Sequence, residues 1–185
     1  MINNRLYEES RYNTLHLRTA YVSQCTDVYG HTMDAGENMA INPTIEKALQ
    51  SALVDLTELH LLTKQAHWNI KGANFRDLHL ALDEITDEVR EAADEIAERM
   101  AALGGAPDAR SATVAATTQL EQLDGGPLRV EDVYVQMEKI ITGVSERMKA
   151  NIDAVDELDH LSADILIGTC AGLEKQAWFL RAAAE

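Results

Sequence analysis

Residues 64–105 read KQAHWNIKGANFRDLHLALDEITDEVREAADEIAERMAALGG. After Gly72, apolar residues recur every three or four positions, which predicts a long amphipathic helix over Asp77–Leu103. Gly104 and Gly105 follow, and glycine is the usual residue just beyond a helix C-terminus. The segment therefore favours an all-α fold.

Two pairs of metal-binding residue types lie on this helix, each pair four residues apart: His79 with Asp83, and Asp94 with Glu98. His67 lies just upstream. An i, i+4 spacing puts both members of a pair on one helix face. Because imidazole and carboxylate groups suit first-row metals such as iron, the spacing predicts an iron site.

The four helix residues share one face but cannot share one metal within one chain. At 100° per residue they fall within an arc of about 100°. Asp83 and Asp94, however, are separated by about 16 Å along the helix axis, whereas a metal holds its ligands at roughly 2 Å. Either each pair binds metal separately, or two chains meet antiparallel about a two-fold axis. The second arrangement makes two equivalent sites per dimer.

The same block resembles the signature of the Dps family, the miniferritins named as DNA-binding proteins from starved cells. The shared motifs occur in the family's order, and the resemblance covers roughly residues 42–183 as judged by the order of elements. The motifs are AHWN at Ala66–Asn69, G-x-x-F at Gly72–Phe75, LHxxLD at Leu78–Asp83, DxxAER at Asp94–Arg99, LGG at Leu103–Gly105 and KQAWFL at Lys175–Leu180.

The resemblance implies a function for these residues. His67, His79 and Asp83 would be the ligands from one subunit, and Asp94 and Glu98 those from its two-fold partner. Such a site oxidises Fe(II) to Fe(III), usually with hydrogen peroxide in preference to dioxygen. The ferric product is stored as mineral in a hollow homo-oligomeric shell of twelve subunits, which protects DNA and the cell from oxidative damage.

Each of these residues also has a structural alternative. A lone histidine on an apolar helix face is more often a packed residue than a ligand. Asp94 and Glu98 could belong to a solvated acidic face, although their place in DxxAER favours ligation. Trp68 is by default a packing residue, and only the resemblance places it beside the iron site. We expect His60 not to be a ligand, and we expect Met100, Met137 and Met148 to fill the core.

The remaining sequence predicts a ferritin-like four-helix bundle, all-α, with a short extra helix between the second and third main helices. This domain is expected over residues 42–185, and residues 1–41 form an N-terminal extension. Asn42 and Pro43 are typical of a helix start. The main helices are expected over Pro43–Lys71, Asp77–Leu103, Glu131–Asp156 and Ser162–Ala183, and the short helix within SATVAATTQLEQL, residues 111–123.

Ferritins and bacterioferritins are the nearest alternative class, because they also use four helices with carboxylate and imidazole ligands. They build the iron site inside one bundle from Glu-x-x-His motifs on two helices. This chain has one such spacing, Glu157 to His160, at the end of an expected helix. We therefore interpret Glu157 and His160 as polar residues at a helix end rather than as metal ligands.

The charge argues against strong DNA binding. Sixteen Lys and Arg residues stand against thirty-one Asp and Glu, a net charge of −15, whereas nucleic-acid binding usually requires a basic surface. The first forty residues contain Arg5, Arg11 and Arg18 but no lysine. DNA binding is therefore expected to be weak or absent. The alternative hypothesis is a DNA-compacting structural shell in which iron chemistry is secondary.

Composition limits the remaining possibilities. No apolar run of 18 residues could span a membrane, and no signal peptide is recognisable, so the cytoplasm is the expected location, with nucleoid association as a variant. The two cysteines, Cys25 and Cys170, are expected to be reduced thiols. Five acidic residues near the third-to-fourth helix junction match the family's acidic pores, or are solvated loop charge: Asp153, Asp156, Glu157, Asp159 and Asp164.

Overall fold

The computed structural model of this chain describes residues 40–185. The expected N-terminal extension, with Cys25 and the three arginines Arg5, Arg11 and Arg18, lies almost entirely outside the described residues. The elements follow in the order α2 (Pro43–Asn69), β1 (Ile70–Lys71), α3 (Phe75–Ala102), α4 (Ser111–Thr117), β2 (Leu128–Arg129), α5 (Val130–Asp156) and α6 (His160–Ala184).

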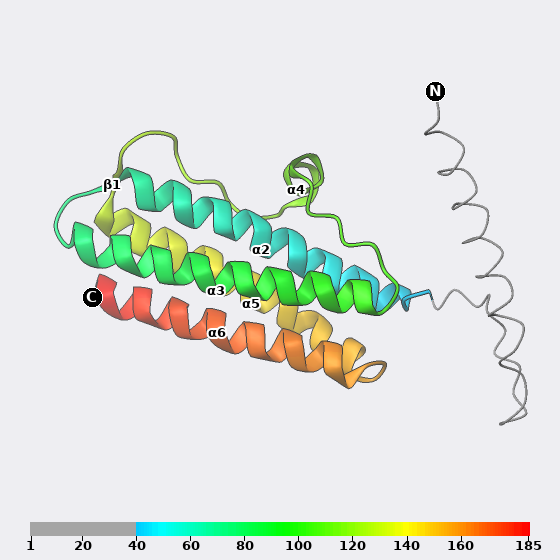
Figure 1. Ribbon diagram of the computed structural model, residues 1–185. Coiled ribbons are helices and arrows are strands. Elements are labelled where there is room, and N and C mark those ends of the chain that lie inside the picture. Colours follow the sequence, from blue (N-terminus) through cyan, green and yellow to red (C-terminus); the bar gives the residue numbers. More distant parts are fainter. Residues whose placement is uncertain (1–39) are drawn as a thin grey trace, which may run out of the picture. The chain divides into compact units, whose positions relative to one another are not determined.

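The four long helices form a bundle of two helical hairpins (Figure 1). Helix α2 packs mainly against α3, and α5 packs mainly against α6. The long connection between the hairpins contains α4, which lies against α2. Apolar residues from all four long helices form one buried core. The predicted all-α four-helix bundle with a short extra helix is confirmed.

Helix α2 begins as the sequence predicts. The Asn42 side-chain oxygen accepts a hydrogen bond from the Thr44 N–H at 2.9 Å, and Pro43 occupies the first turn. Such a cap satisfies one of the backbone N–H groups that have no partner inside the helix. Residues spaced three, four or seven apart are buried along one stripe of the helix: Ile45, Leu49, Ala52, Leu56, Leu59 and Ala66. Ile70, predicted as the last residue of this stripe, is also buried but lies beyond the helix end.

The predicted end of this first helix was wrong by two residues. The helix ends at Asn69, and Ile70 with Lys71 forms a short strand that pairs in parallel with Leu128–Arg129. Gly72 then turns the chain with φ 131°, a conformation that residues with a Cβ rarely adopt. The strand pair connects the α2–α3 turn to the start of α5, so it joins the two hairpins at one end of the bundle.

The other predicted boundaries of the long helices differ from the observed ones by two residues or fewer. The short helix covers only the first part of the predicted segment, Ser111–Thr117. Helix α3 ends at Ala102, one residue before the predicted end and just ahead of the predicted glycine stop. Gly104 adopts φ 84°, and the Gly105 N–H donates to the Met100 carbonyl at 2.9 Å. Helix α6 begins at His160 rather than Ser162, since Asp159 caps it by accepting from the Ser162 N–H at 3.3 Å. Helices α3 and α5 also begin slightly earlier than predicted.

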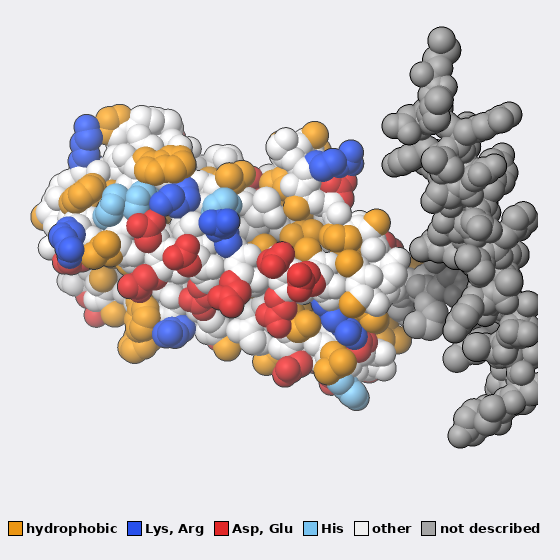
Figure 2. Space-filling model, viewed as in Figure 1, with side chains coloured by type: hydrophobic (Ala, Val, Ile, Leu, Met, Phe, Trp, Pro, Cys, Tyr) orange, Lys and Arg blue, Asp and Glu red, His pale blue; other side chains and the backbone are white. Residues whose placement is uncertain are grey.

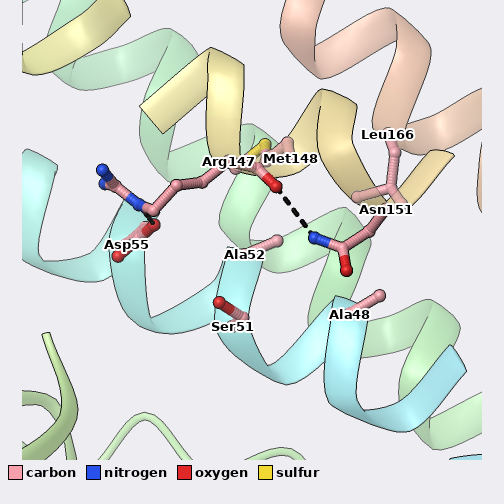
Figure 3. Close-up of a pocket in the computed structure, with 8 residues that line it drawn as sticks. All are labelled: Ala48, Ser51, Ala52, Asp55, Arg147, Met148, Asn151 and Leu166. Atoms are coloured by element: carbon pink, nitrogen blue, oxygen red, sulfur yellow. Dashed lines mark hydrogen bonds and ion pairs between the residues drawn. The ribbon is translucent and has the colours of Figure 1, made fainter. Parts of the chain in front are cut away.

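A charged pair lies inside the contact between the two hairpins (Figure 3). Arg147 Nε on α5 donates to the Asp55 carboxylate on α2 at 2.8 Å. The Asp55 side chain is only 5% exposed, and burial raises its pKa although the guanidinium acts in the opposite direction. Arg147 Nη2 is buried and has no hydrogen-bond partner among the described residues.

The side chains assigned to the core are buried. Met100, Met137 and Met148 are each at most 3% exposed, as predicted. Cys170 is a buried free thiol whose pKa is raised by burial. Across residues 40–185, no helix is both long enough and apolar enough to cross a membrane.

Candidate metal centre

His67 and His79 stack against each other where the end of α2 meets the start of α3. Their ring centroids lie 3.6 Å apart. The Nδ1 atom of His67 lies 2.9 Å from the His79 carbonyl oxygen, and the Nδ1 atom of His79 lies 3.1 Å from the His67 carbonyl oxygen. Because a carbonyl can only accept, each Nδ1 acts as the donor in these bonds. Each Nε2 lone pair is thereby left available to a metal.

Asp83 completes a group of three possible ligands. One ligand atom from each of His67, His79 and Asp83 lies within 4.8 Å of the other two. A metal that holds each ligand at about 2 Å requires ligand atoms no more than about 4 Å apart, so the three side chains would have to move closer together to bind one metal. No other group of three or more such residues comes this close within residues 40–185.

Lys64 occupies the carboxylate that a metal would use. Its Nζ atom lies 2.6 Å from Asp83 Oδ1, and His67 Nδ1 lies 3.3 Å from the same oxygen. The hydrogen bond from Lys64 is the main reason why the pKa of Asp83 is lowered from its usual value. Lys64 was not among the predicted site residues, although its position three residues before His67 puts both on one side of α2 and could have indicated that it lies near the site.

The structure does not bring the other two predicted ligands to this group. Asp94 and Glu98 are exposed and lie further along α3. Helix α3 is continuous from Asp83 to Asp94, so the separation of about 16 Å along the helix axis holds in the folded chain. Three of the five predicted residues therefore meet within one chain, and two do not.

The two helices that carry the histidines also carry exposed apolar side chains. Trp68 is 69% exposed and Leu61 is 52% exposed on α2, while Phe75 and Leu80 on α3 are also exposed. Figure 2 shows hydrophobic side chains beside the histidines and acidic side chains spread over α3. Large apolar groups in water are unfavourable and often mark a contact surface. Among the described residues, His60 is not part of the group formed by His67, His79 and Asp83.

The alternative pair at the α5–α6 junction has other partners. His160 is exposed, and its Nδ1 lies 2.6 Å from Asp156, which raises the pKa of the imidazole. Asp159 accepts from Arg99 Nη2 at 2.6 Å and from the Ser162 hydroxyl, and the bond from Arg99 is the main cause of its lowered pKa. Asp159, one of the five acidic residues near this junction, therefore stabilises the start of α6. Glu157 and His160 form no metal-binding group among the described residues.

Comparison with known proteins agrees with this fold. The family model for a ferritin-like domain matches residues 46–185, so the chain is a ferritin-like protein. The DNA protection during starvation protein of Mycolicibacterium smegmatis is 34% identical over 137 residues, which are 74% of this chain and 75% of that protein. This chain belongs to the Dps family.

Two further relatives are informative. The structure of Dps from Microbacterium arborescens in the high iron form has a TM-score of 0.72 and 32% identity, and the match covers 77% of this chain and 95% of that one. The fine tangled pili major subunit of Haemophilus ducreyi is 38% identical over 152 residues, 82% of this chain and 80% of that protein.

Proposed function

We propose that this protein is a ferroxidase that oxidises Fe(II), with hydrogen peroxide as the preferred oxidant over dioxygen, and stores the ferric product in a hollow homo-oligomeric shell. The observation that carries the proposal is the convergence of two imidazoles and one carboxylate, His67, His79 and Asp83, in a member of the Dps family. The relative described in a high iron form supports iron as the metal.

The proposed chemistry divides between two subunits. His67 and His79 would bind Fe(II) through Nε2, and Asp83 would contribute an oxygen after releasing Lys64. The partner's Asp94 and the partner's Glu98 would complete the site. Each Fe(II) loses one electron, and one peroxide molecule takes two electrons and two protons to become two waters. Ionised carboxylates stabilise the higher charge of Fe(III) relative to Fe(II), so these ligands favour the oxidation.

Exposure supports the shared arrangement. His67 is only 7% exposed and His79 and Asp83 are partly exposed, but Trp68, the neighbour of His67 in the chain, is more than half exposed. A partner packed on this face would cover the apolar groups and supply the missing carboxylates. We propose twelve subunits per shell, in keeping with the family. A filament, as the name of the Haemophilus relative indicates for that protein, would differ in sedimentation behaviour and in electron micrographs.

The protein is proposed to act in the cytoplasm, with weak or absent DNA binding. A shell multiplies a subunit charge of −15, which repels the phosphate backbone. Protection of DNA would then follow from the joint removal of Fe(II) and peroxide. Tight, salt-dependent retardation of plasmid DNA at neutral pH, with chelator present, would instead favour the DNA-compacting shell.

The ligand assignment is tested with the double variant His79→Ala/Asp83→Ala. Anaerobic Fe(II) titration followed by peroxide should show weaker binding and a slower initial oxidation rate, while sedimentation shows an intact assembly. The matched control, His160→Ala/Asp124→Ala, removes one imidazole and one carboxylate from exposed positions elsewhere. Initial rates that are equal in the double variant and in the unmodified protein would reject the assignment.

A further inference from the structure

The middle of α3 holds an exposed pair of opposite charges that the proposed site does not use. Asp87 and Arg90 are both exposed, and neither forms an ion pair within residues 40–185. Together with Glu91 and Asp94 they line an open hollow on the surface. Arg90 lies close enough to His60 on α2 to help lower the pKa of that imidazole. The two side chains are therefore free for an external partner.

The proposed shared site determines what this pair would face. A two-fold axis that places His79 opposite the partner's Glu98, and Asp83 opposite the partner's Asp94, crosses α3 midway between the two motifs. From the first facing pair to the second, the residue number rises by four in one chain and falls by four in the partner, which is about one helical turn toward the axis in each. One further turn inward brings Asp87 opposite the partner's Arg90.

The helical angles agree with this pairing. The arc of about 100° that contains the predicted ligands has its centre between Asp83 and Asp94, and Asp87 and Arg90 lie about 30° to either side of that centre. Both therefore point toward the partner helix. Packed helices lie about 8–10 Å apart from axis to axis, a gap that an arginine and an aspartate together can span. Because the axis is two-fold, the contact occurs twice.

We propose that Asp87 and Arg90 pair reciprocally across the two-fold axis and set the register that brings Asp94 and Glu98 to the partner's histidines. The inference rests on the proposed function, because the axis is located from the shared metal site. A slip of one helical turn would move the partner's carboxylates by about 5.4 Å, more than twice a metal–ligand distance. Asp87 and Arg90 are thus positioning residues, and a second copy of this chain is the partner.

Charge reversal tests the pairing directly. Arg90→Asp alone places four acidic groups around the axis, and Asp87→Arg alone places four basic groups there. Each single variant should raise the concentration at which the two-fold contact half-dissociates by about 10-fold or more. The double variant Asp87→Arg/Arg90→Asp restores opposite charges and should recover most of that loss. Asp124→Arg makes the same charge change at an exposed loop position and should leave association unchanged.

Association is measured by sedimentation velocity over a concentration series, in graded urea below the helix-unfolding transition if the assembly does not dissociate in buffer. Anaerobic Fe(II) binding is measured on the same samples. Single variants that associate like the unmodified protein, or a double variant that recovers nothing, would overturn the pairing. If the association pattern holds but the unmodified protein does not bind or oxidise Fe(II), the proposed function fails while the pairing stands.

Discussion

Replacement of Lys64 with methionine should tighten Fe(II) binding at the candidate centre. In the structure the Lys64 ammonium lies 2.6 Å from Asp83 Oδ1, so Fe(II) and Lys64 compete for one carboxylate. The side chains are 23% and 44% exposed, and solvent therefore screens the pair. Ion pairs of this exposure contribute about 0.2–1 kcal/mol. Without Lys64, Fe(II) no longer has to break this ion pair, so the free energy of Fe(II) binding becomes more favourable by that amount. The expected gain in affinity is at most about 5-fold.

Anaerobic titration calorimetry with Fe(II) measures this change. Lys139→Met is the matched control, because Lys139 forms an exposed pair with Glu121 at 2.7 Å on another part of the surface. That variant should bind Fe(II) as the unmodified protein does. Binding that is unchanged or weaker in Lys64→Met would show that the ammonium does not compete with the metal, and the reasoning from the Asp83 contact would be wrong.

Three further changes test the fold. Asp159→Asn should lower the free energy of unfolding by about 1–2 kcal/mol at pH 7, because Arg99 loses a charged acceptor. The folded-state pKa of Asp159 lies below 3.8, so this stabilisation is present above pH 3.8 and lost as the pH falls through the lowered value. In urea titrations, the free energies of unfolding of Asp159→Asn and of the unmodified protein should therefore become equal at acidic pH. Arg147→Met should cost about 3 kcal/mol in the same assay, because it leaves Asp55 buried and unpaired. That loss should shrink in acid, where protonation removes the buried charge. Asn42→Ala should cost about 1 kcal/mol through loss of the α2 cap, and a thermal midpoint equal to that of the unmodified protein would contradict this role.

The sequence predicted the helices well because their signals are local. Apolar periodicity, the Asn42 cap and the glycine stop after α3 each depend on residues within a few positions of one another. The short parallel pair of Ile70–Lys71 with Leu128–Arg129 was not predicted. Strands of two residues carry no periodicity, and their partner lies more than fifty positions away in the chain.

In the candidate centre, too, the sequence predicts contacts within one helix but not those between helices. His79 and Asp83 lie four apart on one helix, so their proximity follows from the sequence. The stacking of His67 on His79 depends on how α2 packs against α3. The contact from Lys64 to Asp83 also crosses between these helices. The spacing of Lys64 and His67 puts both on one side of α2, but it does not indicate which residue of α3 Lys64 contacts.

Subunit mixing tests most directly the central claim that the iron site is shared between two chains. Asp83→Ala and Asp94→Ala lie on opposite sides of the proposed contact, so a mixed dimer has one intact site and one doubly damaged site. With equal and random exchange, about one quarter of all sites should be intact. The peroxide-driven initial rate of Fe(II) oxidation should then rise to about one quarter of the unmodified rate, above that of either parent. A rate that stays at the parental level, with exchange verified by mass spectrometry, would contradict the shared site.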